Sequence, residues 1–190
     1  MQKLQAEMTA FFKKLYADEP KILVFGEGDL RARLVLIGEA PGEQETIAGR
    51  PFVGKAGKNL DEFLQLSGLE RASLYITNAV KFRPARLSDA GHWVNRPPTQ
   101  EEVKLCLPFL LRELDLLAPS VIATLGNTPL RALLGRQATI GELHGQMLPW
   151  HDCALYPLYH PASMIYNPSL RETYREDVLR LGEWMRTHHD

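Results

Sequence analysis

A glutamate that directly follows an apolar segment is the first candidate for chemistry in this sequence. Glu39 lies in GEAPGEQE, immediately after the apolar residues 34–37. A carboxylate at such a position can orient a water molecule or face a developing positive charge. It can equally cap a helix or pair with a helix dipole, and both interpretations stay open at this point.

The segment GRPFVGKAGK partly matches the phosphate-binding loop G-x-x-x-x-G-K-[ST]. Gly49, Gly54 and Lys55 fit the pattern, but Ala56 replaces the hydroxyl residue that binds magnesium. A phosphate-binding loop also follows its strand directly, whereas this segment comes about a dozen residues later. The spacing therefore argues against a nucleoside-triphosphate site.

Phe52, in the middle of this segment, has several cationic neighbours and no acidic one. Arg50, Lys55 and Lys58 lie close to it in the sequence. One interpretation is a surface loop whose glycines serve turns. The pattern also favours a platform on which a base stacks beside phosphate groups.

Asn78 and His160 each follow a strand-like segment. Asn78 ends YITN, and its amide offers a donor beside an acceptor, which matches a pyrimidine edge with adjacent N–H and C=O groups. His160 precedes a proline, which holds it out of the sheet. The structural alternatives are a turn or cap asparagine and a histidine without a catalytic role.

The composition limits the classes of function. The 190 residues carry a net charge of −1, so a polyanionic partner must be met by a local patch of cations. Cys106 and Cys153 are the only cysteines, which argues against a disulfide framework and against a site built from closely spaced cysteine pairs. We find no membrane span and no signal peptide, and we expect a cytoplasmic protein.

The elements that position these residues alternate between helix and strand. We expect an amphipathic helix at the N-terminus, a hairpin within residues 21–42, and strands at 34–37, 74–80, 120–126 and 154–161. Helices should end near Gly68 and Gly135 and begin at the capping-box patterns Thr99–Glu102 and Ser169–Glu172, and residues 84–98 should form a loop. Alternation predicts a mostly parallel sheet, with ligands bound beyond the carboxyl ends of its strands.

The four segments together resemble a known family. GEAPG, AGRPFVGKAG, ITNAVKFRP and HPAS followed by NP occur in the order and spacing of the uracil-DNA glycosylase superfamily, with the iron–sulfur type called family 4 as the nearest branch. The resemblance covers nearly the whole chain. It implies a single domain over residues 1–190, folded as a three-layer αβα sandwich around a central, mostly parallel four-stranded sheet.

The resemblance also implies roles for individual residues around a uracil flipped out of DNA. Phe52 stacks on the uracil ring, and Asn78 bonds the uracil edge and discriminates against cytosine. His160 faces the ring oxygen that gains charge as the bond breaks, and Glu39 activates water or stabilises the sugar cation. Glu45 matches a second pocket carboxylate, and Ala40 a position that lines the pocket.

Contacts with DNA follow from the same resemblance. Lys55 and Lys58 are expected near phosphates, with Ser163 and Arg171 as further phosphate ligands. The segment SMIY, residues 163–166, lies where the family inserts an apolar wedge into the vacated base stack. Met164 and Ile165 are the candidate wedge residues.

The sequence departs from family 4 at the cluster. That family holds its iron–sulfur cluster with four cysteines, but the N-terminal pair is missing here and Phe82 takes the third position. Cys106 alone remains, and one thiolate cannot hold such a cluster, so we predict no cluster and apolar packing of Phe82. The 84–98 loop is longer than usual, as in a relative that traps uracil-DNA covalently through a histidine. Asn95 matches that position, and we interpret the nearby His92 as an exposed loop residue.

Three functions remain to be compared. The first is a monofunctional glycosylase, expected to be a monomer, that hydrolyses the N-glycosidic bond of uracil in single- or double-stranded DNA. The second is a relative that binds uracil-DNA with little or no turnover. The third, from fold analogy alone, is a small-molecule hydrolase or nucleotide-binding protein.

Overall fold

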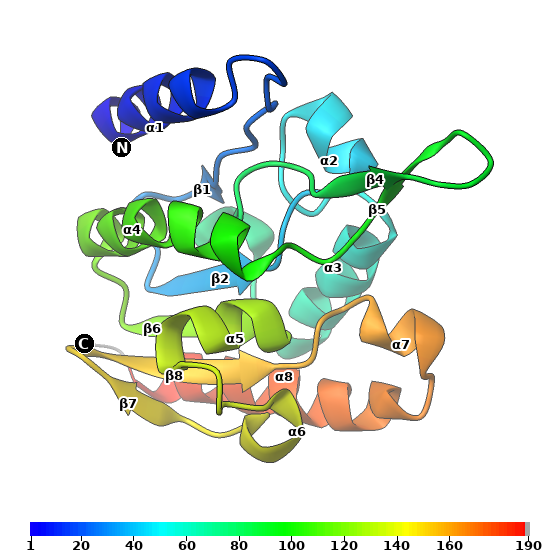
Figure 1. Cartoon of the computed structure of the whole chain (residues 1–190). Helices are drawn as coiled ribbons and strands as arrows, with labels where there is room; N and C mark the ends of the chain where they lie inside the picture. The colour runs from blue at the N-terminus through cyan, green and yellow to red at the C-terminus, as the bar shows by residue number, and fades with distance from the viewer. Residues whose placement is uncertain (189–190) are drawn as a thin grey trace.

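The computed structural model describes residues 1–188, in which a six-stranded sheet lies between two layers of helices (Figure 1). The strand order is β1-β3-β2-β6-β8-β7. Its centre consists of four parallel strands: β3 (Tyr75–Asn78), β2 (Leu34–Gly38), β6 (Val121–Leu125) and β8 (Cys153–Leu158). The predicted three-layer αβα architecture is therefore confirmed.

The sheet has six strands rather than the predicted four. β1 (Glu27–Gly28) pairs antiparallel with β3 at one edge, and β7 (Leu148–Trp150) pairs antiparallel with β8 at the other. Strands of two and three residues are too short to show an alternating pattern, and β7 contains Pro149, which argues against a strand in sequence reasoning.

Helices cover both faces of the sheet. α3 (Lys55–Ser67) and α8 (Leu170–Thr187) lie on one face, and α4 (Gln100–Leu117) and α5 (Asn127–Leu134) lie on the other, with α1 (Gln2–Leu15) packed on α4 (Figure 1). The short elements are α2 (Glu43–Ala48), the 3₁₀ turn Arg71–Ser73, α6 (Ile140–Leu143) and α7 (Ser163–Tyr166). Among residues 1–188, we find no helix long and apolar enough to cross a bilayer.

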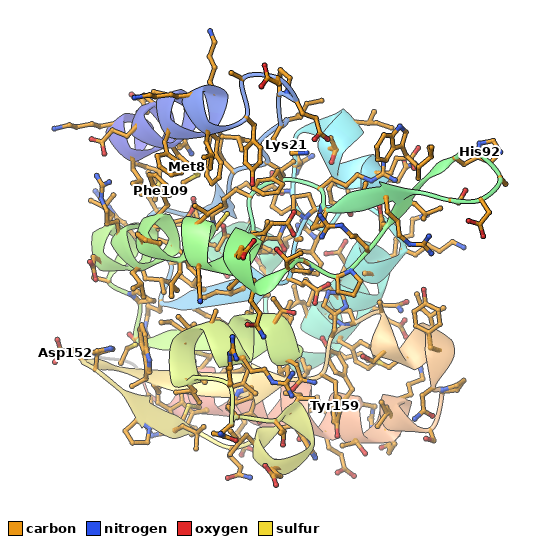
Figure 2. The ribbon with its side chains drawn as sticks, in the orientation of Figure 1. Met8, Lys21, His92, Phe109, Asp152 and Tyr159 are labelled. Atoms are coloured by element: carbon orange, nitrogen blue, oxygen red, sulfur yellow. The ribbon has the colours of Figure 1, made fainter. Side chains whose placement is uncertain are left out.

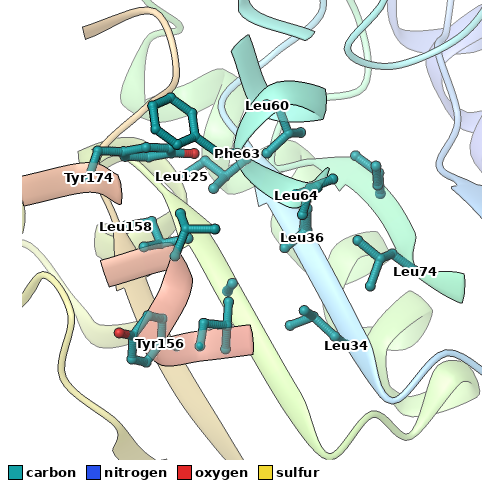
Figure 3. Packing of buried hydrophobic residues seen from close by; sticks show 14 of the residues in the cluster. Leu34, Leu36, Leu60, Phe63, Leu64, Leu74, Leu125, Tyr156, Leu158 and Tyr174 are labelled. Carbon is teal, nitrogen blue, oxygen red and sulfur yellow. The ribbon is translucent and has the colours of Figure 1, made fainter. Parts of the chain in front are cut away.

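Successive side chains of β2 point to opposite faces of the sheet and pack in the hydrophobic clusters on both sides. Leu34 and Leu36 point to the α3–α8 side, where they join Phe63 and Tyr174 (Figure 3). Val35 and Ile37 point to the α4 side and pack against residues such as Leu110. All five residues of β2 are buried, as expected for a parallel strand that is covered on both faces.

Two local predictions fail. The expected hairpin within residues 21–42 does not form, because β1 pairs with β3, where Glu27 faces Ile76. Residues 84–98 are not an irregular loop: β4 (Ala85–Leu87) and β5 (Trp93–Asn95) form an antiparallel hairpin that projects from the body (Figure 1).

The two capping-box predictions have different outcomes. The Thr99 hydroxyl accepts the Glu102 amide, and the Glu102 carboxylate accepts the Thr99 amide, so the first box is confirmed. The second is wrong, because Ser169 has helical backbone angles and its hydroxyl donates to Asn167 at 2.6 Å. The sequence pattern does not record that local competition.

Candidate active site

The carboxyl ends of three parallel strands bring the main candidates to one edge of the sheet. Glu39 follows β2, Asn78 ends β3, and His160 comes two residues after β8. The parallel register places Gly38 opposite Asn78. Strand topology thus gathers residues that are far apart in the chain.

Gly38 makes room for two of these side chains. A Cβ atom at Gly38 would lie 2.4 Å from Asn78 Oδ1 and 2.5 Å from Phe52 Cε2. The phenyl ring and the amide therefore meet over a backbone position where only glycine fits. Asn78 is 3% exposed, and within residues 1–188 its side chain makes no hydrogen bond. A buried amide without a protein partner is suited to bind a ligand edge.

Phe52 has a strained backbone, which its neighbours stabilise. Its φ is +54°, a left-handed value that is unusual for a bulky residue and is found at functional sites. The Arg71 guanidinium donates to the carbonyls of Pro51 at 2.7 Å and Phe52 at 3.2 Å. Gly57 of α3 permits this path, because a Cβ there would lie 1.9 Å from the Phe52 carbonyl oxygen.

Glu45 holds the same loop from the other side. One carboxylate oxygen accepts the amides of Val53 at 3.1 Å and Gly54 at 2.8 Å, and the other accepts the Gly42 amide at 3.1 Å. The carboxylate thus joins the start of α2 to the start of α3. Both oxygens bind backbone amides, so these contacts describe a residue that positions the loop.

A hydrogen bond from the backbone determines which ring nitrogen of His160 carries the proton. The Ala162 amide donates to Nδ1 at 3.1 Å, which leaves the proton of a neutral ring on Nε2. Burial lowers the pKa of His160 to about 4, against a weaker opposing effect of Glu45. The ring lies 5.9 Å from the Phe52 ring, centroid to centroid. At neutral pH it is therefore an uncharged hydrogen-bond donor beside the platform.

Thr128 is the partner of Glu39, and sequence reasoning did not single it out. Its hydroxyl donates to Glu39 Oε2 at 2.5 Å from the first turn of α5. The segment GNTPL follows a strand, and a hydroxyl at such a position was the available signal. The bond holds one oxygen of the carboxylate in place.

A second group that sequence reasoning did not single out lies beneath β3. The fully buried Lys81 ammonium donates to Glu113 and Thr77, each at 2.5 Å. The Tyr75 hydroxyl donates to the other Glu113 oxygen at 3.0 Å, and burial followed by the Glu113 charge raises the pKa of Tyr75. This network fixes β3, which carries Asn78, against α4.

The candidate DNA contacts differ in exposure. Lys55 and Lys58 are exposed in the first turns of α3, where the helix dipole also favours an anion. Ser163 is partly buried, and Arg171 forms an ion pair with Glu62 at 2.5 Å. A role of Arg171 as a phosphate ligand would require it to exchange the Glu62 carboxylate for a phosphate.

Met164 cannot act as the wedge in this conformation. It is 6% exposed and packs in the core beneath α7, so insertion of Met164 into DNA would require a change of conformation. Ile165 is 46% exposed and Tyr166 is 86% exposed. In a single helical turn, one side chain of the apolar segment faces inward, and residue type alone does not say which one.

The residues around Phe82 do not fit an iron–sulfur cluster. Phe82 is 1% exposed and packs edge-on against Phe12 at 5.5 Å and Tyr16 at 5.6 Å between ring centroids. Burial raises the pKa of Cys106 to about 11, so this thiol is protonated at neutral pH. No group of three acidic, histidine or cysteine side chains suited to a metal occurs among residues 1–188. The predicted apolar packing of Phe82 is confirmed.

The remaining three positions considered in the sequence have ordinary surroundings. Ala40 is half-buried and packs against the cluster around Phe82. His92 is exposed at the tip of the β4–β5 hairpin (Figure 2). Asn95 accepts a hydrogen bond from the Arg83 guanidinium at 2.7 Å. The interpretation of His92 as an exposed residue therefore agrees with the structure.

Comparison with known proteins identifies the family. The model of the uracil-DNA glycosylase superfamily matches residues 25–181. This chain belongs to the uracil-DNA glycosylase superfamily. Similar proteins include the type-4 uracil-DNA glycosylase of Thermotoga maritima, 40% identical over 82% of this chain and 79% of that protein. Those of Archaeoglobus fulgidus and Sulfurisphaera tokodaii are 39% and 37% identical, each over 83% of this chain, and over 79% and 72% of their own lengths.

Membership of the uracil-DNA glycosylase superfamily gives the strand-end residues a common context. The matched region includes Glu39, Phe52, Asn78 and His160, together with Thr128. α1 lies before it, and this helix supplies Phe12 to the aromatic packing around Phe82. The aromatic packing around Phe82 is thus formed partly by residues outside the matched range.

Proposed function

We propose that this protein is a DNA-repair glycosylase, a hydrolase that removes uracil from DNA and leaves an abasic site. The observation that carries the proposal is the meeting of Phe52 and Asn78 over Gly38, with the His160 ring beside them. A flat face, an amide edge and a neutral donor together match the three kinds of contact that a flipped uracil offers.

Asn78 reads the base in this proposal. Its carbonyl accepts the uracil N3–H, and its NH₂ group donates to the neighbouring O4. Cytosine presents an unprotonated nitrogen and an amino group at these two positions. The Asn78 carbonyl would then face a second acceptor, and its NH₂ group would face a second donor. The amide is 3% exposed, which makes such a mismatch costly, because little water is available to compensate for it.

His160 and Glu39 stabilise opposite charges as the bond breaks. The glycosidic electron pair moves onto uracil, and the His160 Nε2–H donates to the uracil oxygen that gains negative charge. Glu39, held by Thr128, faces the sugar and takes a proton from the water that attacks C1′. Both interactions strengthen in the transition state, which is the requirement for catalysis.

DNA binding is proposed along the same edge. Lys55 and Lys58 would contact phosphates, with Ser163 and Arg171 on the side of α7 and α8, while Ile165 takes the wedge role. We further propose that the enzyme acts as a monomer in the cytoplasm, on single- or double-stranded DNA, and without an iron–sulfur cluster.

Single-turnover cleavage of uracil-containing oligonucleotides tests the proposal. His160→Ala and Glu39→Ala should each slow cleavage on the order of a hundred-fold or more, with little change in DNA affinity. Asn78→Asp should weaken selection of uracil, since the carboxylate loses the amide donor. Thermal melts establish that the variants are folded.

The wild-type protein separates the alternatives. Abasic product supports the glycosylase, whereas a stable gel shift without product supports a binding protein with little turnover. If neither abasic product nor a gel shift is seen, a small-molecule function is favoured. If folded His160→Ala and Glu39→Ala proteins both cleave at the wild-type rate, the assignment of the site is wrong.

A further inference from the structure

A cationic groove lies between α4 and α5, beyond the residues assigned above. Its cavity has a volume of about 300 Å³. Val103 and Leu107 of α4 supply apolar surface, and Lys104, Arg131 and Arg136 supply positive charge. Figure 1 shows the two helices side by side on one face of the sheet.

The positive charge of this α4–α5 groove is not neutralised within the described chain. The lining residues include no aspartate or glutamate, and none of the three cations has an ion pair among residues 1–188. Arg131 donates through Nε to the Ala138 carbonyl at 3.0 Å, and Arg136 donates to the Gln100 amide oxygen. Both contacts are with neutral groups, so the field of the cations remains.

The cavity beside Phe82 provides the contrast. It is of similar size, about 370 Å³, and it also contains cationic side chains. There Lys21 pairs with Glu19 at 2.7 Å, and Arg96 pairs with Glu102 at 2.7 Å. Its lysine and Arg96 are paired within the protein, whereas the exposed cations of the α4–α5 groove have no acidic partner among residues 1–188 and are open to an external anion.

Thr128 connects the groove to the catalytic edge. The same residue lines the groove and donates its hydroxyl to Glu39. Lys55 and Lys58 lie at the start of α3, on the opposite face of the sheet (Figure 1). A DNA strand that runs from α3 to the α4–α5 groove across the carboxyl edge of the sheet therefore passes the proposed uracil site, with cations on both sides of it.

We propose that the α4–α5 groove binds backbone phosphates of the uracil-containing strand, outside the flipped nucleotide. This inference rests on the function proposed above and extends its DNA footprint to the second face of the sheet. Lys104 and Arg136 contact the phosphates, and Val103 and Leu107 cover an apolar face of the sugar. The net charge of −1 makes such a local concentration of cations necessary for polyanion binding.

Charge reversal in the groove tests the inference. We would measure binding and saturating single-turnover cleavage with a uracil trinucleotide and with a single strand of about 20 nucleotides, long enough to reach beyond one module's site. For Lys104→Glu combined with Arg136→Glu, affinity for the long strand should fall about tenfold or more, and the salt slope by about 0.7 for each lost contact. Trinucleotide binding and the saturating rate should stay at wild-type values.

A matched control separates a local effect from a change in net charge. Lys3→Glu reverses one exposed charge on α1, away from the carboxyl edge, and Lys3→Glu with Lys14→Glu matches the double variant. If the groove variant binds the long strand as the control does, the inference is overturned. Lys104→Ala with Arg136→Ala should show a smaller loss in the same direction and covers the case in which glutamate at these positions prevents folding.

The binding test of the α4–α5 groove does not depend on whether the wild-type protein cleaves uracil-containing DNA. Binding of a uracil-free strand is measured in parallel, so the groove is tested even if the wild-type protein yields no abasic product. Loss of binding without wild-type cleavage would support the groove and reject the glycosylase. Cleavage with unaltered binding of the variant would reject the groove alone.

Discussion

The Thr128 hydroxyl donates to the Glu39 carboxylate across the ends of two neighbouring parallel strands, β2 and β6. The bond fixes the orientation of a side chain that would otherwise rotate at the surface of the sheet edge. It also distinguishes the two carboxylate oxygens, since Oε2 accepts the hydroxyl.

Thr128→Val should therefore slow uracil cleavage. The substitution keeps the branched shape but removes the hydroxyl, and a hydrogen bond to a charged group contributes about 1.5–3 kcal/mol, or roughly ten- to a hundred-fold in rate. Thr128→Ser keeps the donor and should retain most of the activity. Single-turnover rates of both variants decide the question, and a wild-type rate for Thr128→Val would mean that the bond does not serve catalysis.

Gly57→Ala should disturb the Phe52 platform. The new Cβ would lie 1.9 Å from the Phe52 carbonyl oxygen, so the loop must move away from Arg71. We expect a loss of about 1–3 kcal/mol in stability and slower cleavage. Gly141→Ala is the control, because a Cβ added there would meet no atom within 4 Å, and the change should be neutral or stabilising by up to about 1 kcal/mol. Equal melting temperatures for the two variants would contradict the expected crowding at Gly57.

Acidification should reveal the low pKa of His160. The unfolded chain binds a proton at this residue below about pH 6.5, whereas burial delays protonation of the folded protein to about pH 4. The unfolded state binds more protons within that window, so this group makes stability fall as the pH decreases from 6.5 to 4. The melting temperature of the wild-type protein should then drop toward that of His160→Gln.

The rate of uracil cleavage should not change near pH 6.5, unlike the stability of the protein. In the proposed mechanism, cleavage needs the neutral ring with its proton on Nε2, and that form persists to about pH 5 when the pKa is about 4. Single-turnover rates measured between pH 5 and 8 test this. An inflection near pH 6.5 that disappears in His160→Gln would show that the ring titrates normally.

Lys81→Met should destabilise the protein strongly. It leaves the Glu113 carboxylate buried without its cation, and breaking a buried pair costs about 3–5 kcal/mol. Adding Glu113→Gln removes the stranded charge and still accepts hydrogen bonds from Tyr75 or Thr77, so the double variant should recover part of the loss. Urea unfolding of the single and double variants provides the measurement, and equal stabilities would indicate that the stranded charge costs little.

The purified protein should contain no stoichiometric iron. Phe82 fills one ligand position with an aromatic ring that packs against Phe12, and the Cys106 thiol is protonated. Phe82→Cys supplies only a second cysteine near Cys106 and should not acquire iron either. Metal analysis of anaerobically purified protein tests both statements, and a brown preparation with bound iron would refute the first.

Sequence reasoning recovered the parts of the fold with strong periodicity. The buried strands around Leu36 and Ile122 and the helix that begins at Thr99 are long enough for their patterns to be clear. The hairpin of Trp93 and Leu87 was missed, because its strands have only three residues each and lie in a segment bounded by prolines. The capping box predicted at Ser169 was wrong for another reason, because its hydroxyl donates to Asn167 and does not bond the helix amides.

The strand-end positions of the candidate residues were predictable from the sequence, but their hydrogen-bond partners were not. Glu39, Asn78 and His160 stood out because each follows a strand. The hydrogen bond from Thr128 joins residues 89 positions apart, and no local pattern records such a contact. Burial of Met164 likewise depends on the core that α7 covers.

The position of β2 in the sheet has a consequence for the order in which the chain can fold. β2 lies between β3, which follows it closely, and β6, where Leu34 pairs with Val121. A nascent chain on the ribosome can form only one side of β2 until residue 125 has emerged. Nonlocal pairing of this kind slows folding and leaves an open strand edge exposed during synthesis, when contact with other incomplete chains is most damaging. β2, which is buried along its whole length in the folded protein, is thus separated by the longest stretch of synthesis from its second neighbour, β6.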